Sequence, residues 1–388
     1  MRFLHTGDWH VGKTLRGRHR EDEYAAALAE VLDIARREQV DCLLVAGDIF
    51  DSAAPPAEAQ RLVYNFFREL WVAGIPAVVI GGNHDHPRRL AAVAGLLEVV
   101  GVHVRGEPRP PETGGLVEVP SRDGRETALV ATLPWVPERR VVLFDDLLQS
   151  EGEPFKQYSD RTADMLDYLS QAFRANTVNV LLAHVLIDGA VIGAGGGERP
   201  LHLGQAYAVK SERLPATAQY IALGHVHRPQ EVVAAAPTHY AGSLLQLDFG
   251  ERLQTKSVVL AEVHPGVPAQ VQHLTLAAGR ELRDVSGNLA ELGSLADDVG
   301  DAFLRVFVRA DGAVANLAEQ VRAILPNAVD VRCIRPGEPA QEKQRELLAM
   351  GPDELFATFH QQARGHQAPE AVLALFRRLY EEEALAAP

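Results

Sequence analysis

The sequence predicts an α/β fold in which a β-sheet is covered by helices on both faces. Across the first 275 residues, short apolar runs rich in β-branched residues alternate with longer stretches of helical period. This alternation is typical of α/β proteins. The chain of 388 residues is also long enough for two or three domains of about 150 residues each, with a core that needs no disulfides.

The expected strands and helices follow one another in a regular order. The runs 2–6, 41–46, 76–80, 177–183 and 219–223 are expected to be strands, and the stretches 23–38, 57–73 and 90–100 helices. Segments 116–119 and 126–132 flank a polar turn and predict a hairpin, and residues 189–204 are a glycine-rich loop. Strand-like segments at 231–235, 238–241, 257–264 and 270–276 give this domain a β-rich end.

The character of the chain changes near residue 277, which predicts a second, smaller domain. Residues 303–309 and 328–334 are strand-like and flank a helix-like stretch at 315–325, so we expect a small α+β unit containing a βαβ motif. Residues 335–350 are rich in proline and charge, and two short amphipathic stretches follow them. The expected domains are 1–276, 277–338, and a linker with a helical tail at 339–388.

Composition narrows the class of protein. Hydrophobic residues make up 47% and charged residues 23%, which excludes disordered, collagen-like and coiled-coil chains. Two cysteines are too few for a disulfide scaffold, and no apolar stretch reaches the ~18 residues of a membrane helix. We therefore expect a cytoplasmic protein with no membrane partner. The net charge of −14 argues mildly against nucleic acid, although bound dications would offset it locally.

Five of the expected strands end in residues that commonly bind metal ions. In an open α/β sheet, the loops at the carboxyl ends of several strands converge on one site. Residues two apart in an extended segment point to the same side, so Asp8 would lie with His10 and His225 with His227. Glycines at 7, 47, 82 and 224 would permit the turns that expose these side chains.

The number of candidate ligands predicts two metal ions. The candidates are Asp8, His10, Asp48, Asn83, His184, His225 and His227. If one carboxylate bridges, the set supplies four coordination positions to each of two ions. Imidazole, carboxylate and amide ligands suit Mn²⁺, Fe or Zn²⁺. Two dications ~3.5–4 Å apart would activate water and neutralise a phosphoryl centre, which predicts hydrolysis of a phosphate ester.

His84 is a candidate catalytic residue that need not bind metal. Its position beside Asn83 would let it protonate the leaving oxygen as a general acid. Asp51 or Asp85 could orient its ring, and we favour the carboxylate of Asp51. Each motif alone has an ordinary structural explanation, since Gly-Asn-His-Asp is also a common turn. The five motifs together, each at a strand end, favour the metal site.

These motifs resemble those of the calcineurin-like metallophosphoesterase superfamily: Asp-x-His, Gly-Asp-x-x-Asp, Gly-Asn-His-Asp, a single His and Gly-His-x-His, in that order. The resemblance implies a four-layer α/β/β/α sandwich with a dinuclear metal site bridged by Asp48. One metal would take Asp8, His10, Asp48 and His227, and the other Asp48, Asn83, His184 and His225. His84 would be the catalytic histidine, whereas Asp51 stands where relatives often have a second histidine.

Within the superfamily, the chain is similar to the SbcD family of bacterial nucleases, which are homologues of the Mre nucleases. This similarity implies an Mn²⁺-dependent DNA nuclease of DNA repair and recombination, acting as a 3′→5′ exonuclease on duplex ends and an endonuclease on single strands or hairpins. It also implies a capping domain at 277–338, an SbcC-type SMC-like ATPase bound through residues 352–382, and a homodimer formed by helices near 57–73 and 90–100. A phosphoesterase for small phosphodiesters or phosphoproteins, and a non-catalytic scaffold, remain alternatives.

Three features have both a functional and an ordinary interpretation. Lys13, Arg16, Arg18 and Arg20 follow the first ligand pair and would steer DNA phosphates, or would simply be a solvated loop and helix start. Leu62, Phe66, Leu70, Leu96 and Val100 lie at helical spacing and are expected to be mostly core residues. The terminal amphipathic stretches would bind a partner's groove or fold back on their own domain.

Overall fold

The computed structural model describes residues 1–137, 154–192, 208–296, 298–310, 314–334, 356–361, 367–370, 372–373 and 375–376. The chain divides into two compact units. The first contains Met1–Arg283 and Asp301–Phe303, and the second contains Asp284–Gly300 with the described residues from Leu304 onward. The predicted boundary after residue 276 stays a prediction, and the boundary after residue 338 lies outside the described residues.

The first unit contains two six-stranded sheets, and the first of them runs in the order β12-β11-β1-β2-β3-β4. Its strands are β1 (Arg2–Thr6), β2 (Cys42–Val45), β3 (Ala77–Ile80), β4 (Val102–Arg105), β11 (Ser257–His264) and β12 (Val267–Thr275). β1 to β4 are parallel, and β11 pairs antiparallel with both β1 and β12. Because layers cover both faces, the central strands β2 and β3 are apolar and buried at every residue.

The second sheet runs in the order β5-β6-β7-β8-β10-β9. Its strands are β5 (Leu116–Pro120), β6 (Thr127–Leu133), β7 (Val178–His184), β8 (Tyr220–Gly224), β9 (Gln230–Val232) and β10 (Thr238–Tyr240). The predicted hairpin is confirmed, since β5 and β6 pair antiparallel. β6, β7, β8 and β10 are parallel, so their carboxyl ends meet at one edge of the sheet.

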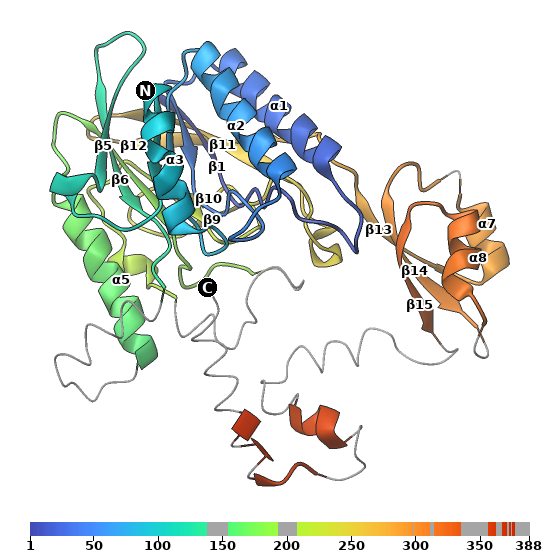
Figure 1. Cartoon of the computed structure of the whole chain (residues 1–388). Coiled ribbons are helices and arrows are strands. Elements are labelled where there is room, and N and C mark those ends of the chain that lie inside the picture. The colour runs from blue at the N-terminus through green and yellow to red at the C-terminus, as the bar shows by residue number, and fades with distance from the viewer. Residues whose placement is uncertain are drawn as a thin grey trace. The chain divides into compact units, whose positions relative to one another are not determined.

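Helices cover the outer faces of the two sheets, so the predicted four-layer α/β/β/α sandwich is confirmed (Figure 1). The helices are α1 (Glu21–Arg37), α2 (Ala57–Val72) and α3 (Pro87–Val99) on the first sheet and α5 (Pro154–Ser170) on the second. Between the sheets, Phe3 and Leu44 of the first pack in one buried cluster with Leu182 of the second. Short 3₁₀ turns lie at Pro111–Thr113, Ser211–Arg213 and Phe249–Glu251.

Two elements of this unit were not predicted, and one core assignment was wrong. β4 has only four residues, too few for a clear period, whereas α5 has an amphipathic pattern like that of α1 and could have been predicted from the sequence. Leu96 on α3 was expected in the core but is 75% exposed. The reason is that α3 packs on the sheet edge through Leu90 as its one fully buried residue.

The second unit has a three-stranded sheet in the order β13-β14-β15. Its elements are β13 (Leu282–Gly287), which starts in the first unit, α7 (Leu289–Ser294), β14 (Phe303–Arg309), α8 (Leu317–Ile324) and β15 (Ala328–Ile334). β14 and β15 are parallel and joined through α8, as the βαβ prediction expected. Asn288 and Glu291 form a capping box that starts α7.

The expected C-terminal helical tail lies mostly outside the described residues, which include a helical segment at 356–361. The linker at 339–350 and most of the glycine-rich loop at 189–204 also lie outside them. Within the described ranges, no helix combines the length and the hydropathy that crossing a membrane requires.

Candidate metal centre

The predicted metal ligands meet where five strands of the two sheets end. They follow β1, β2 and β3 of the first sheet and β7 and β8 of the second, and most are buried. The side chains brought together are Asp8, His10, Asp48, Asn83, His184, His225 and His227. A sandwich whose sheets end at the same edge therefore gathers residues that are up to 219 positions apart, from Asp8 to His227.

The loops after β1 and β2 hold their ligands in an unusual backbone conformation. The N–H groups of Asp8 and His10 donate to the carbonyls of Gly47 (3.0 Å) and Asp48 (2.9 Å). Asp8, His10 and Asp48 have φ values of 48°, 49° and 48°, in the left-handed region that residues other than glycine rarely adopt. The expectation of an extended Asp8–His10 segment was therefore wrong. Such strain is typical of functional sites, where surrounding bonds hold it in place.

Two glycines matter here because of close approach. A Cβ at Gly82 would overlap the carboxylate of Asp48, and a Cβ at Gly224 would overlap the Ala46 carbonyl. Neither residue has a positive φ, so the predicted need for a sharp turn applies to Gly47, whose φ is 90°. The missing side chains let β3 and β8 bring their ligands against Asp48.

The ligands form two groups that share Asp48. In the first, His10 Nε2 lies 3.1 Å from His227 Nε2 and 3.5 Å from Asp48 Oδ2. In the second, Asn83 Oδ1 lies 3.0 Å from both His184 Nε2 and His225 Nδ1. His184 Nε2 is 3.6 Å from the same Asp48 Oδ2. Asp48 Oδ2 is therefore close enough to both groups to be a ligand of a cation in each.

These separations fit the binding of cations. Ligand atoms at ~2.1 Å from one ion in neighbouring octahedral positions lie ~3 Å apart, close to the distances found here. Asp8 is fully buried, and no described residue hydrogen-bonds its Oδ2. Burial raises the pKa of Asp8 to about 6, since its charge is poorly compensated by the protein alone. A cation would supply that compensation.

The ionisation of the cluster also suits metal binding. Burial lowers the pKa of His10 to about 4 and that of His225 to about 3, so both rings are neutral near pH 7 and offer a lone pair. Burial alone would raise the pKa of Asp48, but the neighbouring His184, His10 and His84 hold it below its usual range. The shared ligand is therefore a carboxylate under ordinary conditions.

Hydrogen bonds orient two of the histidines so that Nε2 faces the cluster. His184 Nδ1 donates to the Ala46 carbonyl (2.7 Å), and His227 Nδ1 donates to Glu251 Oε1 (2.9 Å). Because a carbonyl and a carboxylate only accept, the proton is on Nδ1 in both rings and Nε2 carries the lone pair. Glu251 was not predicted from the sequence, because it lies in a largely polar segment, with Asp248, Arg252 and Gln254 nearby, where one more acid carries no distinct signal.

His84 lies at the edge of the cluster, and the group that orients it differs from the one expected. Its Nδ1 donates to the backbone carbonyl of Asp51 (2.8 Å), and its N–H donates to Asp48 Oδ1 (2.8 Å). The expected role of the Asp51 carboxylate is corrected, because that carboxylate lies 2.8 Å from Lys13 Nζ and 3.4 Å from Nδ1 of His10. Asp85 accepts three backbone N–H bonds and so supports the loop.

One residue of the predicted basic cluster, Arg20, is not at the surface. Lys13 is paired with Asp51, while Arg16 lies 3.9 Å from Asp248 and is exposed, as is Arg18. Arg20 is corrected: it is buried, and its guanidinium donates to both oxygens of Glu23 and to the Gln246 carbonyl. Its position at the start of α1 turns it inward, which removes it from the candidate DNA contacts.

Trp135 is a further neighbour that the sequence did not indicate. Its ring stacks on His225, with centroids 5.2 Å apart and an interplanar angle of 20°. It follows β6 in an irregular segment, where no periodic pattern predicts the direction of a side chain. The stacked indole covers one face of His225 and restricts the rotation of that ring.

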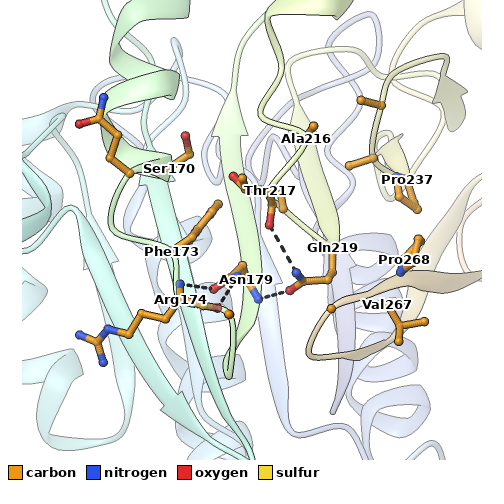
Figure 2. Close-up of a pocket in the computed structure, with 16 residues that line it drawn as sticks. Ser170, Phe173, Arg174, Asn179, Ala216, Thr217, Gln219, Pro237, Val267 and Pro268 are labelled. Carbon is orange, nitrogen blue, oxygen red and sulfur yellow. Dashed lines mark hydrogen bonds between the residues drawn. The ribbon is translucent and has the colours of Figure 1, made fainter.

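A cavity of about 590 Å³ lies at the amino ends of β7 and β8, the opposite end of these strands from the metal ligands (Figure 2). Asn179 and Gln219 line it and are hydrogen-bonded to each other. In the part of the chain that the structure describes, its lining contains no Asp, Glu, His, Cys or Lys. The cavity therefore offers little chemistry, and the ligand cluster is the candidate site.

Comparisons with known proteins agree with this site. The family model described as calcineurin-like phosphoesterase matches residues 1–229, and that described as type 5 capsule protein repressor C-terminal domain matches residues 278–364. The SbcD component of the SbcCD nuclease of Bacillus subtilis is 34% identical, over 98% of this chain and 97% of the relative. The SbcD proteins of Rhodobacter capsulatus and Escherichia coli K12 are 33% and 27% identical, covering 92% and 90% of this chain and 94% and 90% of theirs.

Proposed function

Because the chain belongs to the calcineurin-like phosphoesterase family, among its SbcD members, we propose that it is a DNA nuclease using two divalent cations. The observation that carries this proposal is the position of Asp48 Oδ2, 3.5 Å from His10 Nε2 and 3.6 Å from His184 Nε2. One oxygen placed between two groups of ligands is what a bridged pair of cations requires.

The two ligand groups divide between the cations. One cation would be held by Asp8, His10, Asp48 and His227, and the other by Asp48, Asn83, His184 and His225. The assignment of Asp8 follows the family resemblance, since Asp8 Oδ1 also lies 3.9 Å from His184 Nδ1. These ligands include imidazole, carboxylate and amide groups and no thiolate, which suits Mn²⁺. We propose Mn²⁺ as the working metal, and the metal specificity of cleavage tests this choice.

The cations, when bound, supply an activated water and neutralise charge on the phosphodiester. The protein's own residues then control the proton. His84 Nδ1–H is held by the Asp51 carbonyl, which leaves Nε2 as the ring atom that can donate a proton to the leaving oxygen. The N–H of His84 also donates to Asp48 Oδ1, so the general acid and the bridging carboxylate are fixed relative to each other.

A nuclease assay in Mn²⁺ tests the proposal against its alternatives. The substrates are end-labelled blunt duplex DNA, hairpin DNA and a nitrophenyl phosphodiester, each with and without an SbcC-type ATPase and ATP. We expect 3′→5′ shortening of the duplex and opening of the hairpin. Hydrolysis of the small ester without cleavage of DNA would favour a phosphoesterase for small substrates. Two bound metals with no hydrolysis of any substrate would favour a scaffold.

We further propose two protein partners. An SbcC-type ATPase would bind through residues 352–382, which lie mostly outside the described residues; among those described, Phe356 and Phe376 stack with centroids 4.2 Å apart. Deletion of the residues after Gly351 should abolish copurification with the ATPase and preserve metal binding. Work on DNA with this partner implies a cytoplasmic protein.

The second proposed partner is another copy of the chain. α2 and α3 leave Trp71, Leu96 and Val99 exposed by 55%, 75% and 81%, respectively. Apolar side chains this exposed on neighbouring helices favour a helix–helix interface.

A further inference from the structure

Glu251 is a buried carboxylate that binds one proposed metal ligand through one oxygen and the neighbouring segment, including Ser243 Oγ at 3.5 Å, through the other. Its side chain is 2% exposed. Oε1 accepts from His227 Nδ1 at 2.9 Å, and Oε2 accepts from Lys256 Nζ at 2.7 Å and from the Leu247 N–H at 3.0 Å. Burial of an ion pair adds little net stability compared with apolar packing, so this arrangement calls for a role other than stabilising the fold.

Lys256, which is paired with Glu251, also binds the main chain of His227. Its ammonium donates to the His227 carbonyl at 2.9 Å and to Gln254 Oε1 at 2.8 Å, in addition to Glu251. The three N–H bonds of the ammonium thus have one acceptor each. Through this pair, both the ring and the main chain of His227 are fixed to the segment that carries Glu251.

We propose that Glu251, held by Lys256, is a positioning residue that fixes the ring orientation and tautomer of His227, so that Nε2 is available to a divalent cation. The carboxylate can only accept, so it requires the proton on Nδ1 and leaves the lone pair on Nε2. Nε2 points into the cluster, 3.1 Å from His10 Nε2. This inference rests on the proposed function, because the cation belongs to that site.

The two halves of the cluster differ in the group that orients a histidine. His184, in one half, is oriented by a neutral backbone carbonyl at 2.7 Å, whereas His227, in the other, is oriented by a charged carboxylate. A carboxylate partner increases the basicity of its histidine, and loss of such a partner typically weakens metal binding by about 10–100-fold. Loss of Glu251 should therefore weaken one of the two cation sites and affect the other less.

The test uses two double variants of the full chain. Removal of Glu251 alone would leave the Lys256 ammonium buried without a counter-charge, which is strongly destabilising. Glu251→Leu/Lys256→Met removes both charges and the hydrogen-bond acceptor. Glu251→Gln/Lys256→Met removes both charges but keeps an amide oxygen that can accept from His227 Nδ1. The two variants differ in the side-chain amide at position 251, whose oxygen can accept from His227 Nδ1.

The first readout is the tautomer of His227 in metal-free protein, measured by long-range ¹H–¹⁵N NMR with histidine labelling. We expect the Nδ1–H tautomer in the wild type and the Gln variant, and a shift toward Nε2–H in the Leu variant. The second readout is a titration with Mn²⁺ alone, in which the Leu variant should lose about 10–100-fold affinity at one site. The Gln variant should lose less.

Three results would overturn the proposal. One is an Nε2–H tautomer of His227 in the wild-type protein, a measurement that does not depend on whether either variant folds. The second is a folded Leu variant with an unchanged tautomer and unchanged Mn²⁺ affinity, which would leave Glu251 a purely structural role. The third is equal loss of affinity in the Leu and Gln variants. If the wild type bound no Mn²⁺, the proposed function would fail while the tautomer measurement still decided the positioning role.

Discussion

Replacement of His84 with alanine should abolish turnover while both cations remain bound. None of the proposed metal ligands is removed. Because a ring nitrogen of His84 lies within 4.8 Å of ligand atoms of His10 and Asp48, the metal content of the variant is measured together with its rate. A positioned general acid contributes about 10²–10⁴-fold to a rate, which corresponds to ~2.7–5.4 kcal/mol at 1.36 kcal/mol for each factor of ten. We expect a loss of this size in the cleavage step.

The matched control is Asp51→Asn, because the structure separates the two oxygens that Asp51 could use. The backbone carbonyl that accepts from His84 Nδ1 at 2.8 Å is unchanged in this variant. What is lost is the charge of the Asp51 carboxylate, which lies 2.8 Å from Lys13 Nζ and 3.4 Å from Nδ1 of His10, a proposed metal ligand. The asparagine keeps an oxygen at this position, and the metal content of the variant shows whether His10 is affected. Partly exposed pairs such as that with Lys13 are worth about 0–1 kcal/mol, so the rate should fall by about fivefold at most.

Single-turnover cleavage of end-labelled duplex DNA in Mn²⁺, with metal content measured on the same samples, distinguishes the outcomes. The general-acid role of His84 is refuted if His84→Ala keeps both metals and cleaves within a few-fold of the wild-type rate. If Asp51→Asn is as defective as His84→Ala with its metals intact, the carboxylate orients the ring and the carbonyl does not.

Three further outcomes are expected. Arg16→Ala/Arg18→Ala should lower the slope of log affinity for DNA against log salt by about 2, at roughly 0.9 for each phosphate contact. The control Arg122→Ala/Arg125→Ala removes the same charge from an exposed hairpin turn and should leave the slope unchanged. If the Arg16/Arg18 variant has the same slope as the wild type, these arginines do not contact DNA phosphates. Leu96→Glu on α3 should shift sedimentation toward the monomer. Leu253→Glu replaces another exposed leucine (86%) and should not do so. A wild-type protein that is monomeric at micromolar concentration would exclude the dimer. The third outcome concerns pH. Burial lowers the pKa of His5 in the folded protein to about 3, so as pH falls below ~6.5 the unfolded chain protonates His5 while the folded protein does not, and the free energy of unfolding decreases. At pH 5 this loss of stability from His5 is about 2 kcal/mol, at 1.36 kcal/mol per pH unit. Between pH 7 and pH 5, urea unfolding should show a smaller loss of stability for His5→Gln than for the wild type. Equal losses in the two proteins would contradict this role of His5.

The sequence predicted where the chemistry lies because strand ends carry a strong local signal. An apolar run followed by glycine and then Asp, His or Asn places ligands at the edge of a parallel sheet whatever the loops do. For this reason Asp8, Asp48 and His225 could be grouped from sequence although 217 positions separate Asp8 from His225. The helices α1, α2, α3 and α8 and the hairpin were predictable for a different reason, because their hydrophobic patterns are periodic.

What could not be predicted depends on contacts between distant backbone atoms. A sequence gives residue types but does not reveal that a carbonyl, rather than the carboxylate, of Asp51 faces His84. Nor does it reveal that Arg20 turns inward to Glu23 and Gln246, because a basic residue at a helix start is usually solvated. Trp135 reaches the site from an irregular segment and Glu251 from a short 3₁₀ turn, and neither is long enough to show a period that predicts the direction of a side chain.

The central claim is that two cations share the carboxylate of Asp48. Anomalous diffraction at the manganese edge, from crystals soaked in Mn²⁺, tests it most directly. We expect two peaks ~3.5–4 Å apart, one beside His10 and His227 and the other beside Asn83 and His184, with Asp48 Oδ2 contacting both. A single peak, or peaks that leave Asp48 without a metal contact, would contradict it.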